Sequence, residues 1–213
     1  SPSGTYYDPV DIAPYLTKGS NTIAILLWHF GKDGFSHINS GKRLCYSRRL
    51  LRDWRSSPMR AGSAPCMAYQ NTEAPFPNYR MPESNIRFDA RQAITNWNRT
   101  SSKVPSGGGL RGKAGKAPFG DLVERPIPQW KNSGLLSYVS VRESLRGDTL
   151  FCRLPYNAQI TPYLKVEAEA GKTIHIRMDN YEEEAAQRRA EYITREGEQE
   201  YESYGWMNGH EVY

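Results

Sequence analysis

The sequence contains no long hydrophobic run. Of its 213 residues, 38% are hydrophobic, and no uninterrupted apolar stretch approaches the roughly 20 residues that a membrane-spanning helix requires. The first residues show no charged-then-apolar segment typical of a secretory signal. The last four residues alternate in polarity like the middle of a strand. We therefore expect no membrane span, and we expect a fragment of a larger multidomain chain.

Cysteine is scarce. Cys45, Cys66 and Cys152 are an odd number at wide spacing, which does not favour a disulfide framework. They form no Cys-x-x-Cys pair, and none has a histidine at metal-ligand spacing. We expect buried thiols, and we predict no metal ion and no cofactor.

The motifs of familiar active sites are also missing. No serine lies in a Gly-x-Ser-x-Gly motif. The glycine-rich stretch 107–113 resembles a phosphate-binding loop, but Ala114 stands where that loop needs a Ser or Thr hydroxyl. The acidic run 182–184 is typical of a solvated helix face. We predict no catalytic residue in this chain.

Positive charge is in excess, but it is unevenly placed. The net charge is +5, and residues 1–160 contain 22 Lys and Arg against 11 Asp and Glu, whereas residues 161–213 contain 6 against 12. Most basic residues are scattered singly, without the pattern of a recognition helix or an RNA-binding module. We expect two unlike segments and no nucleic-acid partner.

Strand signals are what the sequence does contain. Runs of β-branched and apolar residues are separated by turn residues along much of the chain. The predicted strands cover residues 21–28, 35–38, 135–141, 148–154, 163–168, 173–178, 198–207 and 210 onward. The predicted fold class is all-β, with two jelly-roll or β-sandwich modules in residues 1–125 and 126–213.

Several connections follow from the same pattern. Residues 163–178 alternate on both sides of Gly171 and predict a hairpin, and Asn208-Gly209 predicts a second hairpin turn. Residues 181–192 predict a short helix, because Glu184 and Arg188 stand four apart in the favourable order. Residues 97–120 predict a long exposed loop.

An aromatic group is the clearest candidate binding surface. Alternation along one predicted strand places Trp28 and Phe30 on the same face, and Phe35 and His37 follow after a turn. Aromatic rings stack on the apolar faces of sugars, and polar neighbours fix their orientation. Trp28, Phe35 and His37 are therefore predicted to bind carbohydrate. The alternative is that Trp28 and Phe30 fill the core of a sandwich.

Asp179 and Asn180 form a second candidate. Their oxygens could ligate calcium or bind the hydroxyls of a sugar. An ordinary Asx turn at the end of a strand is the alternative.

One sequence pattern occurs twice. Residues 12–16 read IAPYL and residues 160–164 read ITPYL, and each precedes a glycine and an apolar strand. Two modules of related design would produce this repeat, and so would chance similarity between strand-turn-strand units.

Three segments carry a resemblance to a known family. The first comprises YDPVDIAPYL (7–16), GSNTIA (19–24) and WHFGKDGFSH (28–37), the second is FDAR (88–91), and the third comprises Val166, AGKTIHI (170–176) and YIT (192–194). Together they resemble the region before the catalytic barrel of bacterial α-L-rhamnosidases. The first is similar to the accessory jelly-roll module of that family, and the second to its Tyr-Asp-Ala-Arg segment, with Phe88 in place of Tyr. The third is similar to the β-sandwich that precedes the barrel.

The resemblance implies a secreted or periplasmic enzyme that removes terminal rhamnose from plant polysaccharides or glycosides by an inverting mechanism. It implies that the partners of this chain are the catalytic (α/α)6 barrel of the same parent chain and a rhamnose-containing carbohydrate. No catalytic residue carries over, because no acidic motif of that barrel is found in the sequence. The alternative is a stand-alone carbohydrate-binding or structural module.

Overall fold

Short strands make up nearly all of the regular structure. The computed structural model describes residues 4–19, 21, 26, 68–72, 85–94, 121–129, 131–181 and 189–213. Its strands are β1 (Gly4–Tyr7), β2 (Tyr69–Asn71), β3 (Ile86–Asp89), β4 (Asp121–Glu124), β5 (Ser140–Glu143), β6 (Leu150–Ile160), β7 (Tyr163–Ala168), β8 (Thr173–Ile176), β9 (Ala190–Ile193), β10 (Gly197–Glu202) and β11 (Met207–Val212).

The described helices are single 3-10 turns of three residues each. They are η1 (Ala13–Tyr15), η3 (Ala90–Gln92) and η4 (Asp179–Tyr181). The all-β prediction is therefore confirmed for the described residues. Within the same residues, no helix has the length and hydrophobicity needed to cross a bilayer.

The chain divides into two compact units. The described residues of the first are 4–19, 21, 26, 121–129 and 131–133, and the second contains the others. In the first unit, β1 and β4 pair in parallel, with Gly4 opposite Asp121 and Tyr7 opposite Glu124. The predicted module boundary after residue 125 stays a prediction. Strands from both sides of it share one sheet in the second unit, because β3 pairs with β9.

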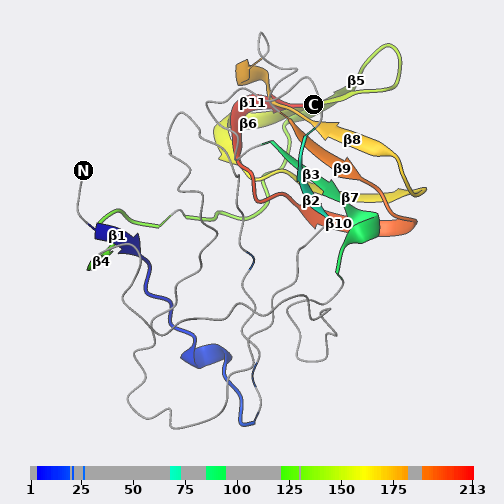
Figure 1. The fold of residues 1–213 in the computed structure, drawn as a ribbon. Coiled ribbons are helices and arrows are strands. Elements are labelled where there is room, and N and C mark those ends of the chain that lie inside the picture. Colours follow the sequence, from blue (N-terminus) through cyan, green and yellow to red (C-terminus); the bar gives the residue numbers. More distant parts are fainter. Residues whose placement is uncertain are drawn as a thin grey trace. The chain divides into compact units, whose positions relative to one another are not determined.

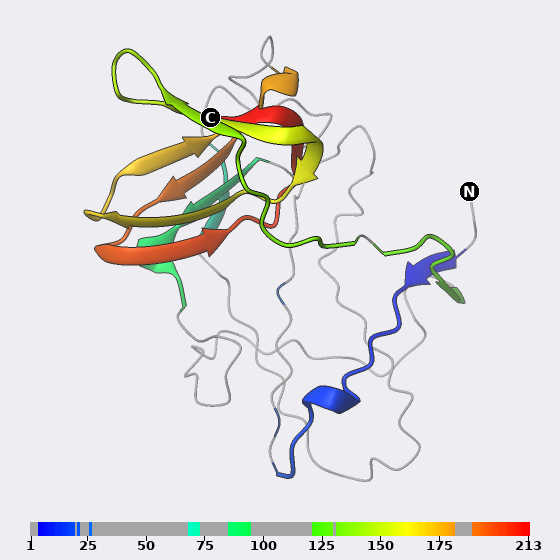
Figure 2. The same cartoon turned by 180° about the vertical axis from the view of Figure 1, so that it is seen from behind.

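The second unit is a sandwich-like arrangement of two layers. One layer is a four-stranded sheet in the order β2-β3-β9-β8, whose strands lie side by side in both views (Figure 1, Figure 2). The strand pairs β7–β10 and β6–β11 supply the facing layer, with β5 as the edge strand next to β6. The backbone amide of Ser203 donates to the carbonyl of Pro162 (2.8 Å). This hydrogen bond links the two pairs where β6 leads into β7 and β10 leads into β11.

The core lies between these layers. Alternation along β10 buries Gln199 and Tyr201 and exposes Glu198, Glu200 and Glu202, as expected for a strand with one solvated face. Burial of apolar area is the main stabilising contribution to such a fold. The main cluster of buried residues is Leu154, Ala158, Ile176, Met178, Ala190, Met207 and Val212.

The predicted hairpin over residues 163–178 is wrong in its pairing, although both strands are present. β7 pairs with β10, and β8 pairs with β9 in the other layer. Gly171 adopts a φ of 87° between them, a left-handed conformation that favours glycine. This turn carries the chain from one layer to the other. Both strands can then bury their apolar faces in the shared core.

The predicted turn at Asn208-Gly209 is also wrong. Both residues lie within β11, which is bulged between Gly209 and Glu211. The Asp179 carboxylate accepts from the backbone amides of His210 (2.8 Å) and Glu211 (3.1 Å) at this bulge. The bulge leaves these amides free for the side chain of Asp179 instead of the neighbouring strand.

Two further predictions need correction. The predicted helix over 181–192 is wrong at its end, because residues 190–192 form β9; residues 182–188 lie outside the described part. Tertiary burial of Tyr192 outweighs a local helix preference there. The predicted strand over 135–141 starts later, at Ser140. The predictions at residues 22–25, 35–38 and 97–120 fall outside the described residues.

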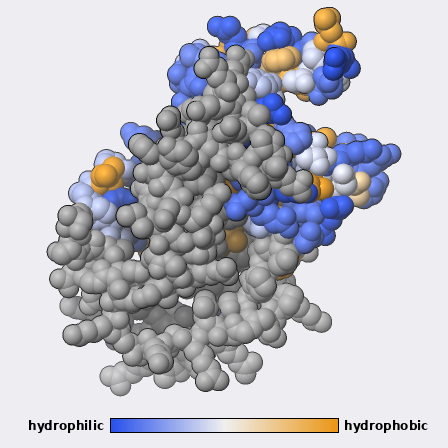
Figure 3. Space-filling model, turned by 45° about the horizontal axis from the view of Figure 1, so that its top comes forward, coloured by the Kyte–Doolittle hydropathy of each residue, from blue (hydrophilic) through white to orange (hydrophobic). Residues whose placement is uncertain are grey.

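The hairpin of β5 and β6 projects beyond the core. Val141 on β5 is 57% exposed and Leu150 on β6 is 55% exposed, and Leu145 at the tip is fully exposed. Hydrophobic side chains appear in orange on this projection at the top of Figure 3. Val141 lies opposite Cys152 on β6, and Cys152 lies opposite the buried Val212 on β11. The core-facing side of the sheet thus continues onto a surface that solvent reaches.

Candidate functional site

The residues predicted to bind sugar, Trp28, Phe35 and His37, lie outside the described residues. The same holds for Phe30, Cys45 and Cys66. The sugar-binding prediction for the aromatic group therefore stays a prediction.

The segment Phe88-Asp89-Ala90-Arg91 folds into a closed local unit. Asp89 ends β3 and accepts from the backbone amide of Arg91 (3.1 Å), from its Nε (2.9 Å) and Nη2 (2.8 Å), and from Gln92 Nε2 (2.9 Å). Its carboxylate is thereby saturated with donors although the residue is only 4% exposed. The hydrogen bonds from Arg91 outweigh the cost of burial and lower the pKa of Asp89 to about 2. Asp89 is therefore an anion at neutral pH, and its hydrogen bonds order the chain after β3.

The turn at residues 170–172 is held by Thr194. The backbone amide of Gly171 donates to the Thr194 carbonyl (2.8 Å), and the Lys172 amide donates to Thr194 Oγ1 (2.9 Å). Thr194 Oγ1 donates to the Glu169 carbonyl (2.6 Å). The turn and Thr194 are thus fixed to each other at one end of the sheet.

An aromatic cluster fills the space between the two layers. The Phe88 ring stacks on Tyr201 (centroids 4.5 Å apart) and on Tyr192 (5.9 Å), and Tyr192 contacts Tyr201 (5.0 Å). Tyr69 extends the cluster from Phe88 (4.7 Å) to Tyr204 (6.0 Å), which is 63% exposed. Burial raises the pKa of Tyr201 to about 12. Tyr192 and Tyr201 are buried by this packing, Tyr69 and Phe88 are partly buried, and Tyr204 is exposed.

The opposite face of the four-stranded sheet carries charge. Glu191 on β9 lies opposite Arg87 on β3 and His175 on β8. Its Oε1 accepts from Arg189 Nε at 2.6 Å, with both side chains about 5% exposed or less, and lies 3.8 Å from His175 Nδ1. Burial lowers the pKa of His175, and the nearby Glu191 partly offsets that effect. The pair satisfies a buried carboxylate, which would be costly if it were unpaired.

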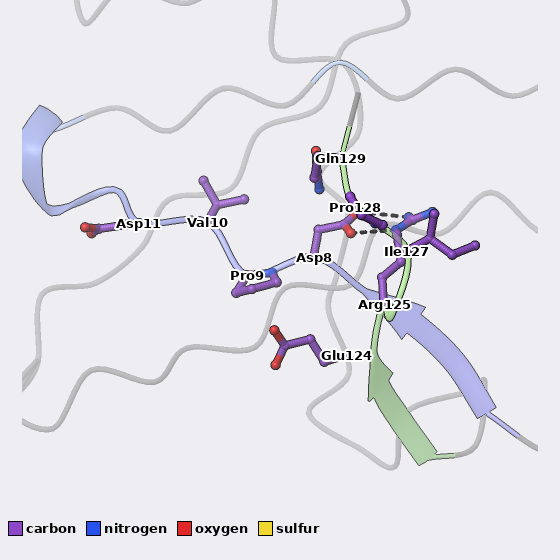
Figure 4. A pocket seen from close by; sticks show the side chains of 9 residues that line it. All are labelled: Asp8, Pro9, Val10, Asp11, Glu124, Arg125, Ile127, Pro128 and Gln129. Carbon is purple, nitrogen blue, oxygen red and sulfur yellow. Dashed lines mark hydrogen bonds and ion pairs between the residues drawn. The ribbon is translucent and has the colours of Figure 1, made fainter. Parts of the chain in front are cut away.

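The described part of the first unit contains a surface groove. The parallel strands β1 and β4 end side by side, and the Arg125 amide donates to the Tyr7 carbonyl (3.1 Å) just beyond them. The two chains then diverge. Residues 8–11 and residues 124, 125 and 127–129 line a groove of about 510 Å³ between them (Figure 4).

An ion pair closes one part of the groove. Arg125 Nε donates to Asp8 Oδ1 (2.6 Å) and Arg125 Nη2 donates to Asp8 Oδ2 (2.9 Å), which is the bidentate geometry of a strong pair. The bond from Arg125 lowers the pKa of Asp8, with a smaller contribution from Gln129. The sequence alone does not reveal this pair, because 117 residues separate its members. The only local signal is that each lies next to a proline directly after a strand.

The candidate at Asp179 has a structural role. Oδ1 of Asp179 accepts from two backbone amides of the β11 bulge. A side chain at Gly209 would collide with the same oxygen. Of the described residues, no three His, Cys, Asp or Glu gather as a group able to hold a metal ion. The structure therefore explains Asp179 by the bulge that it caps.

The described carboxyl groups that have a shifted pKa are all shifted downward. The pKa values of Asp8, Asp89 and Asp148 are all lowered, mainly by hydrogen bonds from Arg125, Arg91 and Ser144. A general acid in glycoside hydrolysis needs a raised pKa. These three carboxylates therefore fit structural roles rather than proton donation.

Comparison with known proteins gives no match. No family model, no curated protein and no solved structure is significantly similar to the chain.

Proposed function

We propose that this chain is the non-catalytic β-sandwich portion of an α-L-rhamnosidase-like glycoside hydrolase. Its parent protein would be secreted or periplasmic and would act on terminal rhamnose of plant polysaccharides or glycosides. The catalytic (α/α)6 barrel of the same parent chain would be its partner.

The observation that carries the proposal is the joining of resemblance segments far apart in the sequence. Phe88 on β3 pairs with Tyr192 on β9, and Ile174 on β8 pairs with Tyr192 from the other side. Parts of three resemblance segments, residues 88–89, 173–176 and 192–193, thus lie in one sheet. Segments that resemble one family and also pack as one unit support a common origin more strongly than separate similarities do.

A second observation supports a non-catalytic role. The most buried of the shifted carboxylates, Asp89, is saturated by donors from Arg91 and Gln92. A catalytic carboxyl needs a face open to the substrate. The described carboxylates with lowered pKa values instead hold the backbone and neighbouring side chains.

Hydrolysis measurements test the proposal. The purified chain is expected to release no rhamnose from an aryl rhamnoside, whereas the parent chain that continues past Tyr213 into a helix-rich domain is expected to release it. An active purified chain would contradict the non-catalytic assignment. A parent chain without rhamnosidase activity, assayed on aryl α-L-rhamnosides and on rhamnose-containing pectin fragments, would contradict the family assignment.

The alternative is a stand-alone carbohydrate-binding or structural module. The aromatic group at Trp28, Phe35 and His37 favours binding, because ring stacking and imidazole hydrogen bonds suit a deoxysugar. Calorimetry with L-rhamnose is expected to detect binding that Trp28→Ala abolishes while the melting temperature is kept. A Trp28→Ala variant that unfolds would assign Trp28 to the core instead.

A further inference from the structure

The outer edge of β5 is a sheet edge without a partner among the described strands. β5 pairs with β6 on one side, and the strand order β11-β6-β5 ends there. All residues of β5 are exposed. The hairpin that β5 forms with β6 projects from the sandwich in both ribbon views (Figure 1, Figure 2). Such an edge offers its backbone groups to another strand.

The hydrogen-bonding pattern shows which residues of β5 present these groups. The Ser144 amide donates to the Thr149 carbonyl (2.8 Å) just beyond β5, so the backbone of Ser144 faces the β6 side of the hairpin. Residues that bond to the neighbouring strand alternate with residues that do not along an antiparallel strand. The backbone groups of Val141 and Glu143 therefore point away from β6, toward the free edge.

A bulge limits this edge at its other end. Ser140 is paired with Arg153 on β6, yet the amide that donates to the Arg153 carbonyl (2.9 Å) is that of Val139. Two consecutive residues thus oppose one residue of β6, as in a β-bulge. The Val139 amide is not available to an incoming strand. The free edge is therefore short, and Val141 and Glu143 are its pairing positions.

Val141 belongs to an apolar row that crosses the sheet. It lies opposite Cys152 on β6, which lies opposite Val212 on β11. Val212 is buried in the core cluster, whereas Val141 is 57% exposed. Leu150, which lies two residues before Cys152 on the same face of β6, is also exposed. Covering this end of the row would extend the existing core.

Charge selects how a second copy of the strand can pair. In an antiparallel pair of identical strands, one residue faces its own copy across a two-fold axis. An axis at Arg142 or at Glu143 would place like charges directly opposite each other, which is destabilising. An axis at Ser140 would require the Val139 amide, which β6 already uses. Of the residues of β5, Val141 is the one at which an axis places valine against valine with no like charges opposed.

The other face of β5 fits the same register. An axis at Val141 brings Arg142 of one copy opposite Ser140 of the second copy. The Arg142 guanidinium already donates to Glu211 (3.1 Å) on β11 and lies over the Phe151 ring (3.8 Å from its centroid) on β6. Its charge is thereby balanced within its own chain, and its side chain extends away from the free edge. The small Ser140 side chain then meets no crowding there.

We propose that the free edge of β5 is a self-association surface, at which a second copy of this chain pairs its own β5 in antiparallel orientation about a two-fold axis at Val141. The Val141 amide of each copy donates to the Val141 carbonyl of the other. The apolar row then runs from Val212 through Cys152 and Val141 into the second copy without interruption. This surface does not depend on the rhamnosidase assignment.

Sedimentation velocity of the full chain tests the association over about 10–500 µM, the range of affinity expected for a small interface. The unchanged chain is expected to show a monomer–dimer equilibrium. Val141→Lys places two ammonium groups at the axis and is expected to raise the dissociation constant more than about tenfold. Val123→Lys is the matched control, because Val123 is a similarly exposed strand valine (49%) in the other unit, and it should leave the equilibrium unchanged. Circular dichroism checks that both variants fold.

Disulfide cross-linking tests the register. Ser140 and Arg142 of opposite copies would form a non-hydrogen-bonded pair, whose Cα atoms lie about 4.5 Å apart, close enough for a disulfide. A mixture of Ser140→Cys chains and Arg142→Cys chains is expected to form an interchain disulfide under mild oxidation. Each variant alone is expected to form no more interchain disulfide than the unchanged chain, which gives the background of the native cysteines. Mass spectrometry of the joined peptides identifies the link.

Each outcome supports or overturns the β5 surface. Dimers that Val141→Lys weakens, together with the disulfide in the mixed sample, support it. An unchanged chain that stays monomeric over the whole concentration range overturns it, and so does equal dimerisation of Val141→Lys. Dimers that form without the mixed-sample disulfide overturn the antiparallel pairing at Val141.

Discussion

Residues 12–16 and 160–164 have nearly the same sequence and different structures. IAPYL contains the 3-10 turn η1, with none of the turn residues buried and Tyr15 81% exposed. ITPYL joins β6 to β7, with Pro162 fully buried and Leu164 packed against both core clusters. The comparison teaches that a five-residue pattern limits the backbone, while the surroundings decide whether it becomes a turn or a strand junction.

The two units also differ in how deeply their strands are buried. In the first, the side chains of Tyr6, Tyr7 and Val123 on the paired strands β1 and β4 are exposed, between 37% and 49%. In the second, residues from four strands, β6, β8, β9 and β11, are buried in one cluster. We therefore expect stability to depend on the second unit.

The largest expected effect is at the aromatic cluster. Tyr192 is 2% exposed, and its hydroxyl donates to Gln199 Oε1 (3.1 Å). Tyr192→Ala is expected to lower the free energy of unfolding by about 3–5 kcal/mol, because it leaves a cavity and removes the hydrogen bond to Gln199. Urea unfolding followed by circular dichroism measures it.

Tyr204→Ala is the control for the same cluster. Tyr204 touches only Tyr69 among the described rings and faces solvent, so the expected change is within about 0.5 kcal/mol. Equal losses from the two variants would contradict the assigned core.

An intermediate effect tests the repeated pattern directly. Leu164→Ala is expected to cost about 2 kcal/mol, less than a fully buried leucine because Leu164 is only partly buried. The corresponding Leu16→Ala change in the first unit is expected to cost less than about 1 kcal/mol. A thermal melt of both variants decides it. If Leu16→Ala were the more costly of the two, the contrast between the copies would fail.

The smallest effect concerns the two Asp–Arg pairs. The pKa of Asp89 is about 2 in the folded chain, below the 3.8 of an ordinary aspartate. The ionised Asp89 stabilises the fold by about 2 kcal/mol at most, because its partner Arg91 is half exposed. This stabilisation is therefore complete above about pH 5. It is lost as the pH falls through about 4 toward 2. Asp89→Asn is expected to flatten this acid limb of the stability curve.

Asp8→Asn serves as the comparison. The Asp8 pair is exposed, and solvent screens it. We expect the acid limb of this variant to match that of the unchanged chain when unfolding is followed between pH 2 and pH 6. A flatter acid limb for Asp8→Asn than for Asp89→Asn would reverse the ranking of the pairs.

Local alternation predicts the strands that have one solvated face. β7 covers residues 163–168 as predicted, because Lys165 and Glu167 alternate with inward-facing residues. Alternation does not predict partners, so it placed β7 and β8 in one hairpin. It also failed at Asn208-Gly209, where Asp179 supplies the hydrogen bonds of a bulge. Neither the partner strand of β7 nor the contact of Asp179 with the bulge can be predicted from neighbouring residues.

The candidate site also has one part that neighbouring residues predict and one part that they do not. The closed unit around Asp89 follows from four consecutive residues, since the carboxylate reaches the amide two positions ahead. The groove at Asp8 could not be predicted, because Arg125 becomes its neighbour only when β1 and β4 pair.

The sequence by itself determined that this protein is built from short strands and that Gly171 forms a turn. Those features depend on side-chain period and on backbone conformations open to glycine, which are properties of adjacent residues. Only the tertiary structure decided which strands pair, which copy of the repeated pattern is buried, and that Asp8 faces Arg125. Those features depend on apolar burial and charge pairing between residues far apart in the chain. No short stretch of sequence shows which distant residues will meet.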